Sequence, residues 1–242
     1  MSHHDESDDP RRRLLLQALA AGFFATGLPV ASTVAGPFGS IPGKLPPERS
    51  IYRLSGRVLV NGKPADTATR IGPRDTIETA AGAEIVFAVG QDAYILRGGS
   101  KLVLATQPGQ SEVANLLRVF AGKVLAVFGR GVHNIETPTA TLGIRGTGVY
   151  IEGDPEQTYL CTCYGTVALA ARNNRDSRET IVSKHHDQPR YILNKAATGQ
   201  YIRPAPFINH TDVELMLIEA LVGRTPPFTF PSDDYTAPRR GY

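Results

Sequence analysis

The chain has 242 residues, of which 41% are hydrophobic, 20% charged and 7% aromatic, and these values suit one sizeable folded core or two small ones rather than a disordered chain. The 26 Lys and Arg residues against 23 Asp and Glu give a net charge of +3 that is spread along the sequence, which does not favour dedicated nucleic-acid binding. The 2 Cys exclude a disulfide framework, and the 24 Gly with 18 Pro indicate many turns and short elements, as in a β-rich protein.

Residues 1–35 have the order of an export signal. Three consecutive arginines, Arg11 to Arg13, precede an uncharged stretch from Leu14 to Ala31, and small residues follow up to Ala35. A basic region, an apolar region and a small-residue cleavage site occur in this order in secretory signal peptides. The letters RRLLLQ at 12–17 resemble the twin-arginine signal, which directs export of folded proteins. We therefore expect cleavage after Ala35 and a bacterial periplasmic location.

A retained membrane anchor is the alternative for this segment. Its uncharged stretch has about 18 residues, which is just enough to span the hydrocarbon core of a bilayer. Gly22, Gly27 and Pro29 disfavour a permanent helix there, so we expect membrane association only if the segment is retained.

The remaining chain is predicted to be mainly β. Residues 36–50 form a flexible lead rich in Gly and Pro, and a β domain with a C-terminal extension is expected over 51–208. Short apolar runs separated by turn residues, several of them alternating, favour a twisted solenoid-like or sandwich-like arrangement. The runs are 57–60, 84–89, 93–96, 101–104, 116–120, 123–128, 133–136, 147–152, 158–163 and 166–170.

One amphipathic helix is predicted over 209–224. Thr211 and Glu214 form a capping box, and Gly223 supplies the stop. Apolar residues recur at helical spacing between 213 and 221, so the helix is expected to pack on the β domain or, alternatively, to dock against a partner. Residues 225–242 are expected to form a disordered tail.

Four segments in succession resemble a FecR domain. They are GRVLVNGKPA (56–65), IGPRDTIETAAGAEIVFAVGQDAYILRGGSKLVL (71–104), LLRVFAGKVLAVFG (116–129) and HNIETPTATLGIRGTGVYIE (133–152). The resemblance implies a mostly β, solenoid-like, non-catalytic signalling module of the periplasm or cell surface with an envelope protein as partner. Regulators of this family relay a signal from an outer-membrane iron–siderophore receptor to a cytoplasmic sigma factor. Their sigma-binding region, typically with Trp, has no counterpart here, so we expect a free-standing exported form.

The signature residues of the resemblance are Thr137, Pro138, Arg145, Gly146 and Thr147. Glycines on both sides of Arg145 and Thr147 permit a tight bend between strands. An arginine held in such a bend is expected to bond a carbonyl or carboxylate of its own fold, with a direct ligand role as the alternative. Thr137 and Pro138 are expected to mark a strand edge.

A metal site is the most chemically specific possibility in the sequence. Cys161 and Cys163 lie two apart on a predicted strand, so both sulfurs project from one face with Cα atoms roughly 6.6 Å apart, where a disulfide would be strained. Two thiolates suit copper(I) or supply half of a zinc site, and His185 and His186 would complete the set if the chain folds back. The alternatives are buried core thiols beside solvated histidines, or a strained or intermolecular disulfide.

Motifs for catalysis are missing from the sequence. It contains no Walker phosphate loop, no dinucleotide-binding fingerprint opening a βαβ unit and no His-Glu-X-X-His motif. We therefore expect binding without catalysis, as a sensing, scaffolding or signal-relay module at the cell envelope. The alternative is a periplasmic metal-binding protein with copper or zinc at the Cys-X-Cys and His-His residues.

Overall fold

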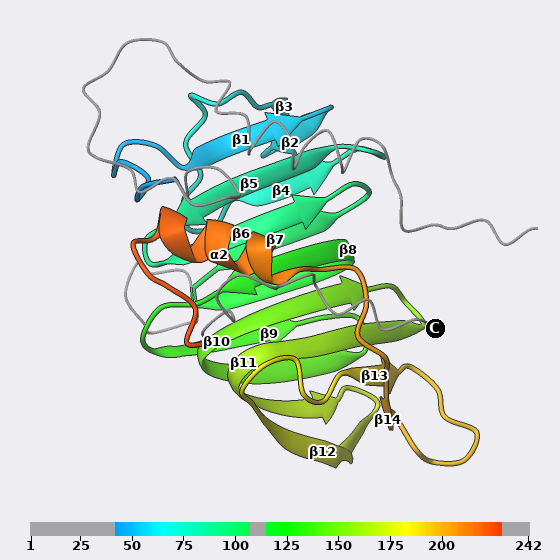
Figure 1. Ribbon diagram of the computed structural model, residues 1–242. Helices are drawn as coiled ribbons and strands as arrows, with labels where there is room; N and C mark the ends of the chain where they lie inside the picture. The colour runs from blue at the N-terminus through cyan, green and yellow to red at the C-terminus, as the bar shows by residue number, and fades with distance from the viewer. Residues whose placement is uncertain (1–41, 107–114, 229–242) are drawn as a thin grey trace, which may run out of the picture. The chain divides into compact units, whose positions relative to one another are not determined.

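The computed structural model describes residues 42–106 and 115–228. The predicted signal peptide, most of the flexible lead and the end of the tail lie outside the described residues. Contacts divide the chain into Met1–Gly43 and Lys44–Tyr242, and the second unit contains the whole β domain. Over its described residues it is mainly β with a single C-terminal helix, so the predicted fold class is confirmed (Figure 1).

All strand pairs in the β domain are antiparallel except β8 with β9, which run parallel. The sequence predicted no strand at β1, β3, β4 or over β12 to β14, since β12 is mostly polar and the other five have five residues or fewer. The strands are β1 (Ile51–Ser55), β2 (Val58–Val60), β3 (Lys63–Pro64), β4 (Thr76–Thr79), β5 (Glu84–Val89), β6 (Asp92–Arg97), β7 (Lys101–Ala105), β8 (Leu116–Val127), β9 (Val132–Glu136), β10 (Ala140–Gly153), β11 (Gln157–Ala171), β12 (Asn174–Ser183), β13 (Arg190–Leu193) and β14 (Ile202–Pro204).

The strands form two layers that share the long strands β8, β10 and β11. In the first layer the order is β1-β5-β6-β8-β10-β11-β13-β14, built on the later halves of β8 and β10 and the earlier half of β11. The second layer has the order β3-β2-β4-β7-β8-β9-β10-β11-β12 and uses the other halves. Each of the three strands therefore passes from one layer into the other.

A large apolar core lies between the two layers, and a smaller one lies on the outer face of the first layer. Strand β5 shows how the alternation serves both, because Ile85 and Phe87 enter the large core while Val86 and Ala88 enter the smaller one. Both faces of the first layer are therefore buried.

Helix α2 (Asp212–Leu221) covers the smaller core, and Figure 1 shows it lying across the strands of the first layer. The predicted capping box is present at Thr211 and Glu214. Leu215, Ile218 and Leu221 are buried in the smaller core with residues of β5, β6 and β8. The apolar face is thus occupied by the sheet, which leaves it unavailable to a partner in this conformation. Within the described ranges, no helix is both long and apolar enough to cross a membrane.

The signature segment forms the bend where β10 changes layers. The β10–β11 register shifts between Arg145 and Gly148, and the Thr147 hydroxyl donates to the carbonyl of Arg145 at 2.7 Å. The Arg145 side chain is exposed, and its guanidinium has no hydrogen bond or ion pair among the residues that the structure describes. This differs from the expected internal bond, because the bend is held by Thr147 and not by the arginine.

Thr137 closes the connection between β9 and β10. Its hydroxyl accepts a hydrogen bond from the amide of Ala140 at 2.9 Å and lies 2.7 Å from the hydroxyl of Thr158. This agrees with a strand-edge role for Thr137, which Pro138 follows with a half-buried ring.

Gly165 is the point where β11 changes layers, and it has a φ of +90°. A Cβ added there would lie 2.7 Å from Thr147 Oγ1 and 2.8 Å from the carbonyl oxygen of Gly146. We expect Gly165→Ala to lower the free energy of unfolding by about 2 kcal/mol or more, measured by urea denaturation.

The control is Gly146→Ala, since Gly146 also has a positive φ, of 54°, but a Cβ there meets nothing within 4 Å. It should cost only about 1 kcal/mol, the price of the backbone conformation alone. Equal losses of unfolding free energy in the two variants would show that the missing side chain at Gly165 is not needed for the close approach of β11.

Candidate metal centre

The two cysteines lie on the earlier half of β11 and face helix α2. Cys161 and Cys163 are fully buried in the smaller core, and both are free thiols. Thr162 lies between them and points to the opposite face, as strand alternation requires. The predicted placement of both sulfurs on one side of a strand is therefore what the structure shows.

Two histidines from different segments meet these sulfurs. His186, in the loop after β12, places Nδ1 at 3.4 Å from Cys161 Sγ. His210, just before helix α2, places Nε2 at 3.4 Å from Cys163 Sγ, and the two ring nitrogens are 3.1 Å apart. All four ligand atoms lie within 4.8 Å of one another. We call Cys161, Cys163, His186 and His210 the Cys-His cluster.

Hydrogen bonds outside the cluster fix which ring nitrogen carries a proton. His210 Nδ1 lies 2.7 Å from the carbonyl oxygen of Ile208, which can only accept, so Nδ1–H donates. His186 Nε2 lies 2.9 Å from the Asp212 carboxylate and donates to it for the same reason. In neutral imidazoles the facing nitrogens, His186 Nδ1 and His210 Nε2, are then both lone-pair acceptors. Two such acceptors 3.1 Å apart repel each other, and a metal cation, a ring proton or the thiol protons of Cys161 and Cys163 at 3.4 Å can relieve that repulsion.

The electrostatics agree with this account. Burial opposes ionisation of Cys161, but its hydrogen bonds with Cys163, His186 and His210 outweigh burial and hold the pKa of its thiol well below the usual value. Burial also opposes a charge on His186, yet hydrogen bonds to Asp212 and Cys161 raise its pKa to about 9. Burial, together with the neighbouring Cys161, raises the pKa of Cys163 well above normal. Without metal, these shifts favour negative charge on the Cys161 sulfur and a proton on His186.

The distances in the cluster match the edges of a zinc tetrahedron. Zn–N bonds near 2.05 Å and Zn–S bonds near 2.3 Å place tetrahedral nitrogens about 3.3 Å apart and nitrogen and sulfur about 3.5 Å apart. The observed separations are 3.1 Å for the two nitrogens and 3.4 Å for the pairs Cys161 Sγ–His186 Nδ1 and Cys163 Sγ–His210 Nε2. The other three edges are no longer than 4.8 Å, so one ion at the centre could bond all four atoms after shifts of about 1 Å or less.

His185 stands outside the Cys-His cluster. Its Nε2 lies 2.9 Å from Asp212 Oδ1, and its side chain is 39% exposed, against 9% for His186. The structure therefore joins three of the four predicted ligands and supplies His210 as the fourth. Sequence reasoning missed His210 because it lies 47 residues after Cys163. Its position directly before the helix cap at Thr211 was the available signal.

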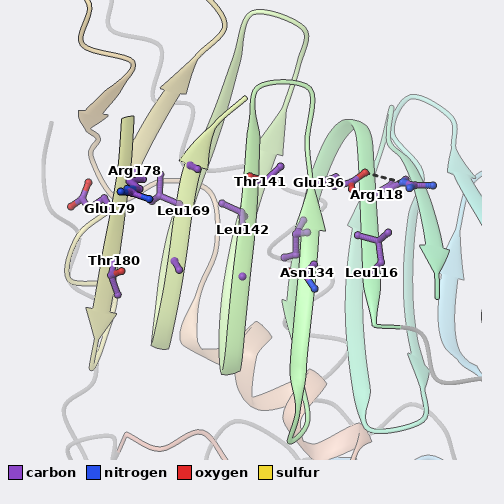
Figure 2. Close-up of a pocket in the computed structure, with 14 residues that line it drawn as sticks. Leu116, Arg118, Asn134, Glu136, Thr141, Leu142, Leu169, Arg178, Glu179 and Thr180 are labelled. Atoms are coloured by element: carbon purple, nitrogen blue, oxygen red, sulfur yellow. Dashed lines mark hydrogen bonds and ion pairs between the residues drawn. The ribbon is translucent and has the colours of Figure 1, made fainter. Parts of the chain in front are cut away.

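A second candidate surface lies on the outer face of the second layer. Figure 2 shows an open groove that crosses β8, β9, β10, β11 and β12, with a volume of about 790 Å³. Arg118 and Glu136 form an ion pair of 2.9 Å on β8 and β9, and Arg178 lies on β12. The short side chains that make the hollow are Thr141, Gly143, Ala168 and Ala170.

Comparisons with known proteins give a limited likeness. No family model matches the chain, and no curated protein matches it. Two crystal structures, at 2.50 Å and 1.65 Å resolution, of a protein proposed to be an anti-sigma factor from Parabacteroides distasonis ATCC 8503 are similar to 54% of this chain. They are 13% identical to it, with TM-scores of 0.43 and 0.42. The match spans 58% of that protein, and at these values it assigns no activity to this chain.

Replacing each histidine in turn tests the ligand set. We expect His210→Ala to lose most of the bound metal, because it removes one of four donors, and His185→Ala to keep it, because His185 bonds Asp212. Metal content per chain, measured by mass spectrometry after gel filtration, checks both. If His185→Ala loses the metal and His210→Ala retains it, the ligands are those predicted from the sequence, with His185 in place of His210.

Proposed function

We propose that this chain is a non-enzymatic metal-binding protein that holds one zinc(II) or copper(I) ion in the Cys-His cluster. A single observation carries the proposal: two imidazole nitrogens and two sulfurs converge on one buried point. The outer nitrogens of His186 and His210 are already committed to Asp212 and to the carbonyl of Ile208. A cation at the centre satisfies all four inward atoms at once.

The donor set selects the class of ion. Two thiolates and two imidazoles suit zinc(II), and copper(I) is the other ion that favours thiolate ligands. Four protein donors fill a tetrahedral shell and leave no position for a substrate or an activated water. The cysteines are fully buried, and His210 is only 3% exposed, which keeps solvent from a fifth position. Such a closed shell favours a structural or sensing role over catalysis.

Metal analysis of protein purified anaerobically with a phosphine reductant tests the proposal. We expect about one equivalent of zinc or copper per chain, and loss of most of it in the double variant Cys161→Ser, Cys163→Ser, because hydroxyls are poor ligands for these ions.

The matched control is Thr162→Ser, which changes the residue between the cysteines on the opposite face of β11 and should keep the metal. If wild-type protein holds no stoichiometric metal, either as purified or after incubation with zinc(II) or copper(I), the proposed function is wrong.

A signal-relay role at the cell envelope is the second candidate, and the groove across β8 to β12 favours it. Relay needs a surface for a partner, and this groove lies on the outer face of the second layer, whereas the Cys-His cluster lies on the outer face of the first. The FecR resemblance and the export signal at residues 1–35 support a sensing or scaffolding module in the periplasm with an envelope protein as partner.

Site-specific crosslinking in intact cells tests the relay role. A photoreactive residue at position 180, on the β12 side of the groove, should crosslink a protein in the periplasmic fraction, and Ala168→Arg should abolish the product by filling the hollow. The same probe at position 63, in β3, serves as the control and should give no such product. Retention of the protein in the cytoplasm, or a crosslink insensitive to Ala168→Arg, would count against this role.

A further inference from the structure

We infer that the metal ion fastens the C-terminal arm, residues 205–228, to the first sheet layer, and that Asp212 is the positioning residue through which ion binding stabilises helix α2. The inference rests on the proposed function, because it assigns a regulatory consequence to the same cluster.

The ligands come from three separate segments of the chain. Cys161 and Cys163 belong to β11, His186 belongs to the loop after β12, and His210 belongs to the arm. An ion that bonds all four therefore joins the arm to the sheet through His210. Moving the arm away breaks a metal–nitrogen bond and leaves a three-donor site, which binds the ion more weakly.

Asp212 connects the cluster to the helix itself. It is the first residue of α2, its side chain is 5% exposed, and its carboxylate accepts hydrogen bonds from Nε2 of both His185 and His186. A metal ion on His186 Nδ1 fixes the orientation of that ring and strengthens the Nε2–H bond to the carboxylate. One of the two bonds that hold the start of α2 to the loop after β12 therefore depends on how firmly His186 is held, and the other comes from His185.

The arm also has anchors that do not involve metal. The hydroxyl of Tyr159 donates to the carbonyl of Pro206 at 2.9 Å, and Arg97 pairs with Glu214 at 2.7 Å. The amide of Leu45 donates to the carbonyl of Leu221 at 2.9 Å, and apolar helix residues fill the smaller core. We therefore expect the metal-free arm to stay docked but to open more often. If the ion binds more tightly when the arm is docked than when it is open, it shifts the docking equilibrium by the ratio of those two affinities.

Hydrogen exchange measured on the full chain tests the inference. Protein made metal-free with a chelator under reducing conditions is compared with the same protein loaded with zinc(II). We expect amides of α2 to exchange about tenfold or more slowly in the loaded form, within the 5–150-fold range usual for coupled sites. Amides of β4 and β7, in the second layer, should change much less.

Two variants of the first helical turn separate coupling from helix stability. Asp212→Ala keeps all four metal ligands but removes both carboxylate oxygens, so neither His185 nor His186 has an acceptor there. It should retain metal while most of the zinc-dependent protection is lost. Glu214→Gln weakens the capping box and the pair with Arg97 without touching a histidine. It should raise exchange in both forms and leave their ratio unchanged.

The outcomes distinguish the two proposals. Stoichiometric zinc with equal exchange of α2 in both forms overturns the inference and leaves the proposed function standing. Absence of binding overturns the proposed function. Full zinc-dependent protection in Asp212→Ala removes Asp212 from the coupling, and the wild-type comparison stands even if that variant does not fold.

Discussion

The passage of β11 through both sheet layers is the constraint on which both candidate surfaces depend. Its earlier half belongs to the first layer, where Cys161 and Cys163 face the C-terminal arm. Its later half belongs to the second layer, where Ala168 and Ala170 help to form the groove. Gly165 allows the change of layer because its positive φ and lack of a side chain let β11 approach Thr147 closely. A single bend thus positions the cluster and the groove on different faces of the domain.

The geometry of the cluster separates the chemical possibilities for its cysteines. Core thiols need only apolar neighbours, but here each sulfur has an imidazole nitrogen at 3.4 Å. A disulfide would join two side chains that leave one strand in parallel, and the structure has both thiols free. The histidines are oriented by Asp212 and by the carbonyl of Ile208, as metal-bound histidines usually are. This outer set of hydrogen bonds is the one a metal site uses to orient its histidines, and it supports the proposed metal binding.

The arrangement also gives the helix a second role besides covering apolar surface. Leu215 and Ile218 bury the outer face of the first layer, while His210 and Asp212 bring polar groups to the end of the same segment. Apolar packing is indifferent to the presence of an ion, whereas the proposed metal–nitrogen bond at His210 requires one. Under the proposed function, a single short arm therefore combines a permanent attachment with one that responds to metal.

The sequence by itself determined the mainly β class, the single capped helix and the pairing of both sulfurs on one strand face. These features follow from local rules, namely the alternation of apolar residues, the capping box at Thr211 and Glu214, and the two-residue period of a strand. Only the tertiary structure decided that His210, rather than His185, joins the cluster, and that Arg145 lies exposed at a bend. Both outcomes depend on contacts between segments remote in sequence. No local spacing encodes how the chain after β14 returns to β11, because that return is set by the burial of α2 against the first layer.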